Sequence, residues 1–198
     1  MKKKKLEMIL QNLPPLAHPK PHLEQYTTPA PIAAEILYLA YAKGDIQDKI
    51  VVDLGCGNGI FTIGASLLGS RMAIGVDADP MAIRVAKVNA ERVKCDAEFI
   101  LAILPFFHVR ADTVIQNPPF GAQKKGADRP FLATAMNIAD VVYSMHLYET
   151  ADFVTTFVRE RGWKITFQKV YKFEIPWMFS FHKKEKKEFK VLLMRIAK

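Results

Sequence analysis

The strongest constraint on the fold is a segment in which an apolar strand runs into a glycine-rich turn. This segment, Val51–Gly59, reads V-V-D-L-G-C-G-N-G and leads directly into a helical pattern. Glycines allow positive φ angles and let a ligand approach the backbone closely. A tight strand-to-helix turn can use glycine without binding anything, but three alternating glycines behind an aspartate exceed what a turn needs. The segment therefore predicts a ligand-binding loop.

The rest of the chain alternates short apolar runs with helical patterns. We expect strands over 49–54, 72–76, 97–101, 112–116, 141–145, 164–173 and 187–196, and helices over 29–42, 59–68, 80–92, 131–137 and 150–161. This alternation predicts an α/β fold with a mainly parallel sheet and helices on both faces. The last two strands have no helix between them, so we expect them to pair antiparallel at one edge.

The first 27 residues differ in composition from the rest, being basic and then rich in proline. They predict an extended arm ahead of a single domain over residues 28–198. Thr28 is a plausible N-cap for the first helix of that domain, since Pro29 suits the first helical position. We find no internal repeat and no domain linker.

Asp77 ends the second predicted strand, at the sheet edge that also carries the glycine loop. A carboxylate in this position can accept both hydroxyls of a ribose. The alternative is a helix N-cap, because Pro80 begins a helix three residues later. We favour the ribose role, because strand-end carboxylates of open α/β sheets face the ligand crevice.

The fourth predicted strand ends in Asn117-Pro118-Pro119-Phe120. An isolated N-P-P would be a proline turn, but this one lies at the same sheet edge as the glycine loop. The Asn117 oxygen and the Pro118 carbonyl could accept the two N–H bonds of a planar amino group, orienting its lone pair. Phe120 offers a face for a flipped base. Transfer of a chemical group to such a nitrogen depends on the alignment of the reacting atoms and requires no strong general base.

The spacing D-x-G-x-G-x-G resembles the motif of class I S-adenosylmethionine-dependent methyltransferases. That resemblance implies a Rossmann-like, seven-stranded sheet with S-adenosylmethionine as cofactor. It also implies that Asp53 holds the glycine loop and faces the cationic methionine end of the cofactor. The resemblance and the strand-end arguments together predict these cofactor residues: Gln25, Tyr26, Thr28, Asp53, Gly55, Cys56, Gly57, Gly59, Asp77, Ala102 and Ile103. Gln25 and Thr28 would help to close the site.

Several further motifs together resemble the methyltransferase-like 5 family, over about residues 6–196. These are E-Q-Y at 24–26, N-P-P-F-G at 117–121, V-Y-S at 142–144 and F-H-K-K at 181–184. The resemblance implies N6-methylation of an adenine in small-subunit ribosomal RNA and a small zinc-binding activator protein as heterodimer partner. One position departs from the family, which usually has an aspartate for the cofactor's adenine where this chain has Ala102. A backbone contact from Ile103 could replace it.

The chain carries a formal net charge of +8, which favours a polyanionic partner. Basic residues near the predicted reaction edge indicate an RNA-binding surface, and solvated surface is the alternative. The predicted RNA-binding residues are Lys124, Lys125, Arg129, His182, Lys183, Lys184, Lys186 and Lys187. The two cysteines and five histidines show no metal-ligand spacing. We expect a cytoplasmic protein without a membrane span.

Two rival functions remain open at this point. A protein glutamine methyltransferase would also use an N-P-P motif, and a non-catalytic RNA-binding protein could keep the same fold. The predicted partner has independent support in the third strand, which is short and expected at the sheet edge, where it would invite pairing by another chain. Such pairing would bury Phe99. The alternative is that a helix or the N-terminal arm covers this edge.

Overall fold

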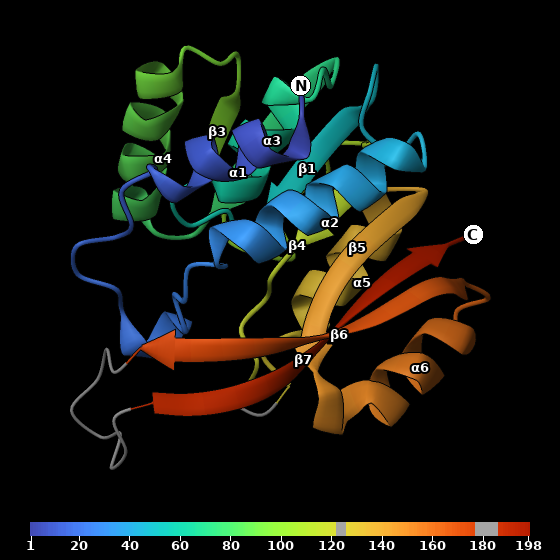
Figure 1. The fold of residues 1–198 in the computed structure, drawn as a ribbon. Helices are drawn as coiled ribbons and strands as arrows, with labels where there is room; N and C mark the ends of the chain where they lie inside the picture. The colour runs from blue at the N-terminus through green and yellow to red at the C-terminus, as the bar shows by residue number, and fades with distance from the viewer. Residues whose placement is uncertain (122–125, 177–185) are drawn as a thin grey trace.

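A single mixed sheet forms the centre of the molecule (Figure 1). A computed structural model describes residues 1–121, 126–176 and 186–198. Within these ranges the sheet has seven strands in the order β3-β2-β1-β4-β5-β7-β6. Their bounds are Ile50–Leu54 (β1), Met72–Asp77 (β2), Glu98–Leu101 (β3), Thr113–Gln116 (β4), Val141–Leu147 (β5), Lys164–Pro176 (β6) and Lys186–Ala197 (β7).

Strands β1 to β5 run parallel, whereas β7 runs antiparallel to both β5 and β6. The predicted α/β class, the antiparallel pairing of the last two strands and the edge position of the third strand are therefore confirmed. The register brings Leu54, Val76 and Gln116 side by side. Because parallel strands end at the same edge, the segments that follow β1, β2 and β4 meet there.

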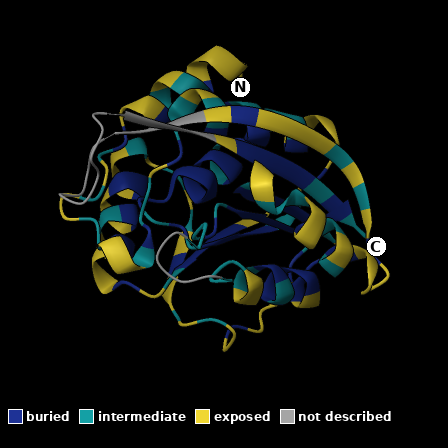
Figure 2. Ribbon diagram, turned by 90° about the horizontal axis from the view of Figure 1, so that it is seen from below, coloured by how far each residue is buried: buried dark blue, intermediate teal, exposed yellow. Residues whose placement is uncertain are grey.

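Helices cover both faces of the sheet, and residues alternate along each strand between two cores. Val51, Ala73 and Ile115 belong to the core under helices α1 to α4, whereas Val52, Ile74 and Val114 belong to the core under α5 and α6. Figure 2 shows the central strands as largely buried. The helices span Lys3–Gln11 (α1), Ala30–Ala42 (α2), Ile60–Leu67 (α3), Pro80–Val93 (α4), Arg129–Ile138 (α5) and Ala151–Arg159 (α6). No helix of the described residues is long and apolar enough to span a membrane.

The expected extended conformation of residues 1–27 is wrong at its beginning, where helix α1 forms. Leu6 and Leu10, four residues apart, share one helical face and are 0% and 2% exposed in the core. Lys2–Lys5 dominate the composition of this segment, whereas the apolar spacing that indicates a helix consists of two leucines. After α1 the chain has one 3₁₀ turn, η1 (Pro21–Leu23), before α2. The domain boundary placed after residue 27 stays a prediction.

Candidate functional site

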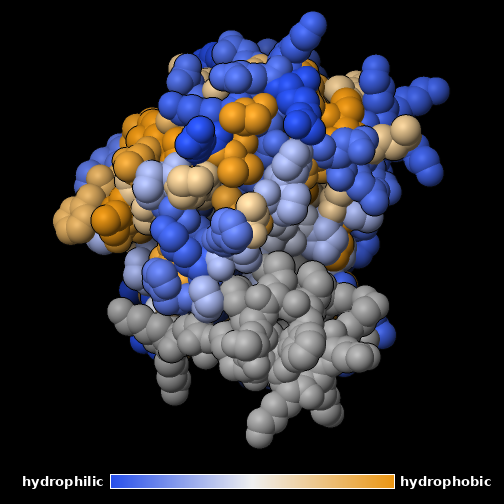
Figure 3. Space-filling view, turned by 90° about the vertical axis from the view of Figure 1, so that its left-hand side faces the viewer, coloured by the Kyte–Doolittle hydropathy of each residue, from blue (hydrophilic) through white to orange (hydrophobic). Residues whose placement is uncertain are grey.

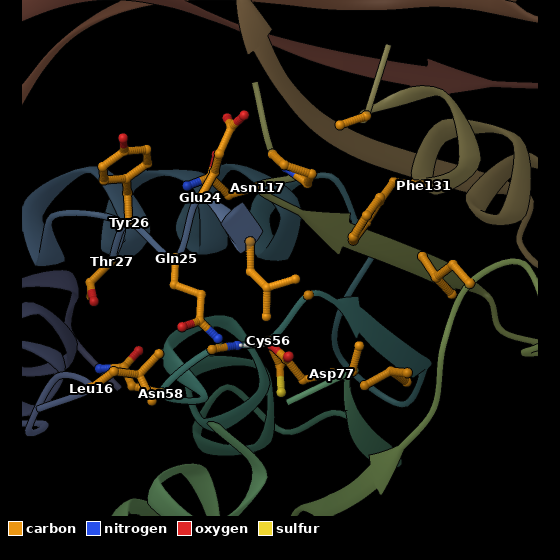
Figure 4. A pocket seen from close by; sticks show the side chains of 18 of the residues that line it. Leu16, Glu24, Gln25, Tyr26, Thr27, Cys56, Asn58, Asp77, Asn117 and Phe131 are labelled. Atoms are coloured by element: carbon orange, nitrogen blue, oxygen red, sulfur yellow. Dashed lines mark hydrogen bonds between the residues drawn. The ribbon is translucent and has the colours of Figure 1, made fainter. Parts of the chain in front are cut away.

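A cavity of about 430 Å³ opens where the parallel strands end (Figure 4). Its size is that of a site for a small molecule. Its wall comes from residues 16, 22–28, 55–58, 60, 61, 76–78, 102–104, 117, 119, 126, 127, 130 and 131. In Figure 4, Asn117 and Glu24 lie toward one side of the cavity, and Cys56 and Asp77 lie toward another. The cavity thus joins the two sequence motifs that were expected to bind cofactor and substrate.

The glycine loop has the positive φ angles that its glycines allow. Gly55 and Gly59 have φ angles of +75° and +85°, in the left-handed region that favours glycine. A Cβ on Gly55 would lie 3.0 Å from the Phe131 ring, and one on Gly59 would lie 3.2 Å from Ala86. The backbone nitrogens of Gly55 and Cys56 donate to the Val76 carbonyl, so β2 fixes the loop. Gly55, Cys56 and Gly57 line the cavity, whereas Gly59 lies behind it.

Asp53 is not among the described residues that line the cavity, so its expected contact with the methionine end of the cofactor stays a prediction. It is 2% exposed, and its carboxylate accepts from the backbone nitrogen and the hydroxyl of Thr62, at 3.1 and 2.9 Å. Burial raises the pKa of Asp53 to about 7, against the lowering effect of the Thr62 bonds, and the charge of Asp77 adds to the rise. Asp53 therefore anchors the first turn of α3, and through it the loop.

Asp77 lies on the wall and braces the glycine loop from β2. Its two oxygens accept from the backbone nitrogens of Gly57 and Asp79, both at 2.9 Å. Burial raises the pKa of Asp77, although these bonds oppose the shift. The alternative role as helix cap is wrong, because Asp79 caps α4 by accepting from the backbone nitrogen of Met81. Since a carboxylate can accept about four hydrogen bonds, Asp77 keeps acceptor capacity toward the cavity.

Residues 12–29, which we call the N-terminal strap, cross the cavity and are fastened at several points. Gln25 accepts from the backbone nitrogen of Lys20 and donates to Asp79, at 2.7 and 2.9 Å. The Lys20 ammonium lies 2.9 Å from the other oxygen of Asp79. Burial alone would raise the pKa of Asp79, but the bonds from Gln25 and Lys20 hold it below its ordinary value. One buried carboxylate thus caps α4 and also holds the strap.

Two asparagines fasten the beginning of the strap. Asn58 and Asn89 both donate to the carbonyl of Pro14, at 3.2 and 3.0 Å. Neither asparagine, nor Asp79, was predicted as part of the site. Their partners lie 44 to 75 positions away in the sequence, so no local pattern indicates the contacts.

Asn117 is held by the strap as well. Its side-chain nitrogen donates to the hydroxyl of Thr28 at 3.1 Å, and its oxygen Oδ1 is buried without a hydrogen-bond partner in the described structure. The predicted N-cap role of Thr28 is wrong, since Pro29 occupies that position and no side chain caps α2. The hydroxyl instead accepts from the Asn117 amide nitrogen, which leaves the amide oxygen without a partner among the described residues.

The aromatic wall of the cavity differs from the prediction. Pro119 lines the cavity, but Pro118 and Phe120 are not among the described lining residues. Phe120 packs beside the core under α1 to α4. Phe131, in the first turn of α5, lines the cavity instead. In the sequence, an apolar residue in a helix indicates a core position as readily as a binding site. The role of Phe131 in the cavity wall is therefore visible only in the structure.

Glu24 brings the strap against the segment that contains Asn117, and Tyr26 follows two positions later in the strap. Glu24 has a φ angle of +49° and its carboxylate accepts from the backbone nitrogen of Gly121 at 3.1 Å. Tyr26 lines the cavity, and burial followed by the charge of Glu24 raises its pKa. Ala102 and Ile103 also lie on the wall, where Ala102 offers no carboxylate.

Of the predicted RNA-binding residues, the structure describes one side chain. The Arg129 guanidinium lies over the Phe153 ring, 4.4 Å from its centroid. Lys186 and Lys187 belong to β7, where only the backbone is described. Lys124, Lys125, His182, Lys183 and Lys184 lie outside the described residues.

Comparisons with known proteins agree with this geometry. Residues 37–118 match the family described as ribosomal protein L11 methyltransferase (PrmA). An uncharacterized protein of Methanocaldococcus jannaschii is 43% identical, over 100% of this chain and 95% of its own length. The solved structure of a protein from Pyrococcus horikoshii, provisionally described as an RNA methyltransferase, has a TM-score of 0.93 and 42% identity, covering 100% of this chain and 98% of that one.

A relative with a named activity covers the same extent. The rRNA N(6)-adenosine-methyltransferase METTL5 of Danio rerio is 36% identical, over 100% of this chain and 99% of its own length. The corresponding protein of Drosophila melanogaster is 32% identical over 96% of this chain and 94% of its own. Because the similarity spans both the cofactor loop and the Asn117 segment, this chain belongs to the METTL5 family of rRNA N6-adenosine methyltransferases.

Proposed function

We propose that this chain transfers the methyl group of S-adenosylmethionine to N6 of an adenosine in ribosomal RNA. The observation that carries the proposal is Asn117 Oδ1, a buried acceptor without a partner in the described structure. Leaving such a group unsatisfied costs about 1–3 kcal/mol, so a ligand N–H is expected there. Thr28 holds the amide nitrogen, which leaves the oxygen for the substrate.

The cavity fits the proposed cofactor. Asp77 would accept from the ribose hydroxyls, and the backbone of Gly55 and Gly57 would lie along the methionine end. Ala102 and Ile103 would flank the adenine. When bound, S-adenosylmethionine supplies an electrophilic methyl group on a sulfonium. These assignments rest on the lining residues and the acceptors that they present.

The protein's part in the chemistry is alignment. Asn117 Oδ1 would accept one N–H of the target amino group, and the Pro118 carbonyl would accept the other. Holding both protons turns the nitrogen lone pair toward the reacting methyl group, and Asn117 Oδ1 itself is buried from solvent. Phe131 gives the cavity an aromatic wall for the target base. The transfer requires no strong general base, because the amino proton is lost after the nitrogen becomes cationic.

RNA is favoured over a protein substrate by the extent of the similarity. The match to the L11 methyltransferase family covers residues 37–118, which hold the cofactor loop and end at the N-P-P motif. The METTL5 relative matches 100% of the chain, including the segments beyond the motif that would meet a substrate. The Lys and Arg residues predicted to bind RNA complete this proposal, and so does the cytoplasmic location expected from the sequence.

The proposal includes a small zinc-binding activator protein that pairs with β3. This strand has β2 on one side, and no described strand lies on its other side. Leu101, the last residue of β3, is 56% exposed, and Phe106, five positions later, is 79% exposed. Figure 3 shows apolar side chains on this flank of the molecule. Phe99 is already 7% exposed against the core, so the expectation that a partner buries it is wrong. Pairing would satisfy the backbone groups of β3.

One experiment tests the function. The protein is incubated with methyl-labelled S-adenosylmethionine and either ribosomal RNA or total cellular protein. Label in N6-methyladenosine after RNA digestion is the expected result. Label in protein alone would support glutamine methylation, and cofactor binding without transfer to either fraction would support a non-catalytic RNA-binding protein. Parallel reactions with a co-expressed activator, checked by size-exclusion chromatography, test the heterodimer.

A further inference from the structure

Two buried polar residues lie on one face of β5, next to the segment that begins with Asn117. Ser144 and His146 are 0% and 1% exposed, and their side chains point to the same face because they are two positions apart. That face packs under α5 and α6, where Val142 belongs to the apolar core. A histidine and a serine in such a place need hydrogen-bond partners.

Their partners form one continuous chain of hydrogen bonds. Gln116 Nε2 donates to Ser144 Oγ at 2.9 Å, and Ser144 Oγ lies 2.7 Å from His146 Nε2. His146 Nδ1 in turn lies 3.2 Å from Asp128 Oδ2. We call these four residues, Gln116, Ser144, His146 and Asp128, the β5 chain. None of them was predicted as a site residue from the sequence.

The hydrogen bonds of the β5 chain are mutually compatible. Ser144 Oγ accepts from Gln116 Nε2 and has a proton to give to His146 Nε2. In that arrangement the ring proton of His146 is on Nδ1, facing the Asp128 carboxylate. Each bond thus has one donor and one acceptor, and the chain runs without interruption from β4 to the beginning of α5.

The two ends of the β5 chain are neighbours of cavity residues. Gln116 directly precedes Asn117, and Asp128 directly follows Gly126 and Ala127, which line the cavity. Both ends are therefore linked by hydrogen bonds to side chains of β5, which lies inside the sheet between β4 and β7. A change at His146 would move the acceptor and the opposite wall relative to each other, although His146 itself does not line the cavity.

We propose that His146 and Asp128 are positioning residues for methyl transfer, an inference that rests on the proposed function. The groups expected to hold the cofactor, Asp77 and the glycine loop, belong to β2 and the β1–α3 connection. The helix α5 is anchored separately by Leu132 and Ala135, which are 1% and 0% exposed. Loss of the β5 chain should therefore lower kcat and leave cofactor affinity almost unchanged.

The test uses Asp128→Ala, Asp128→Asn, His146→Phe and the double variant Asp128→Ala/His146→Phe. With a displacement of about 1 Å, kcat on ribosomal RNA should fall on the order of 10²-fold in Asp128→Ala and His146→Phe. The Kd for S-adenosylmethionine, measured by calorimetry, should stay within about threefold. Asp128→Asn keeps an acceptor oxygen and should retain most of the rate. The double variant should be no slower than the slower single variant, because either substitution alone already interrupts the hydrogen bonds of the β5 chain.

Tyr143→Phe is the matched control. Tyr143 is the neighbour of Ser144 on the opposite face of β5, and its hydroxyl donates to Asp45 at 2.5 Å beside Arg195. None of these three residues lines the cavity. The control should lower Tm and leave kcat unchanged, which separates the removal of a buried hydrogen bond from the removal of positioning.

Unchanged kcat in Asp128→Ala and His146→Phe, with only a lower Tm, would overturn the inference. Rate decreases that multiply in the double variant would overturn it too, because the two residues would then act separately. Should His146→Phe fail to fold, the comparison of Asp128→Ala with Asp128→Asn still decides. A wild-type protein that methylates no RNA would instead refute the proposed function, so the two failures are distinct.

Discussion

The side-chain nitrogen of Asn117 donates to the hydroxyl of Thr28, which lies 89 positions earlier in the chain. An asparagine amide can point its oxygen in either of two directions, and the two give opposite hydrogen-bonding character to the site. Thr28 is 3% exposed and its hydroxyl accepts from the nitrogen, so the oxygen is the atom left for a substrate amino group.

Removing the acceptor should stop the reaction without emptying the cofactor site. Asn117→Ala should lower kcat by about 10²–10³-fold, as for other positioned polar groups that stabilise a transition state. Calorimetric affinity for S-adenosylmethionine should change only a few-fold, since Asp77 and the glycine loop remain. Turnover close to that of the wild type would show that Asn117 does not hold the target nitrogen.

The orientation of the same amide can be tested at Thr28. Thr28→Val keeps the shape of the side chain but removes the hydroxyl, so the Asn117 amide loses the partner that fixes its direction. We expect kcat to fall by roughly 10-fold, about the effect of removing one hydrogen bond. Thr28→Ser keeps the hydroxyl and serves as the control. Equal rates for the valine and serine variants would rule out this role.

Asp77 should contribute directly to cofactor affinity. Asp77→Ala removes charge-assisted bonds to the ribose and should weaken S-adenosylmethionine binding by ~1.5–3 kcal/mol. The variant also loses the bond to the Gly57 nitrogen, so Asp77→Asn, which keeps an acceptor for it, is measured in parallel. Calorimetry that gives wild-type affinity for Asp77→Ala would restrict Asp77 to bracing the loop.

The buried carboxylate of Asp53 should make the protein less stable as pH rises. Its folded pKa of about 7 lies above the ordinary value of 3.8, so the native state binds more protons than the unfolded state between these two values. Unfolding free energy therefore falls with rising pH through this window and levels off above it. Relative to the wild type, Asp53→Asn should gain roughly 2–3 kcal/mol between pH 5 and pH 8.

Urea unfolding at the two pH values measures this gain. Asp77, whose pKa burial also raises, is present in both proteins, so the comparison reports the loss of the Asp53 carboxyl together with its coupling to Asp77. Parallel stability curves for wild type and Asp53→Asn would mean that Asp53 keeps an ordinary pKa in the folded protein.

The basic residues at positions 183–187 should govern the salt dependence of RNA binding. Replacing Lys183, Lys184, Lys186 and Lys187 with glutamine should weaken RNA binding. The slope of log K against log salt should become shallower by roughly 0.7 for each RNA phosphate that the variant no longer neutralises. Affinity for S-adenosylmethionine should be the same as in the wild type. If the salt slope of the variant matched the wild type, these lysines would not bind phosphate.

The parts of the fold that the sequence predicted are those with a local cause. The glycine spacing of Gly55 and Gly59 reflects positive φ angles, and the continuous apolar run at Val51 and Val52 reflects a strand buried between two opposite cores. Asp77 and Asn117 could be placed at one sheet edge because parallel strands end together. These features depend on neighbours in the sequence or on a general rule of topology.

What the sequence did not predict depends on distant partners. The sequence predicts Thr28 as a helix cap, but its hydroxyl accepts from the side-chain nitrogen of Asn117 instead. Asp53 has the motif position of a ligand-facing residue, and the sequence does not indicate that its carboxylate is buried and accepts from Thr62. His146 gave no signal, because Ser144 and Asp128 are identified as its partners only when β5 and α5 are placed together.

The N-terminal strap has a consequence for how the protein is made. Gln25 and Thr28 leave the ribosome well before Asp79 and Asn117, the residues that hold them in place. Until those partners are synthesised, the strap has nothing to fasten to, so the cavity closes only after β4 is complete. A chain whose strap cannot fasten would keep the sheet edge that the strap covers, and we expect it to bind the cofactor weakly.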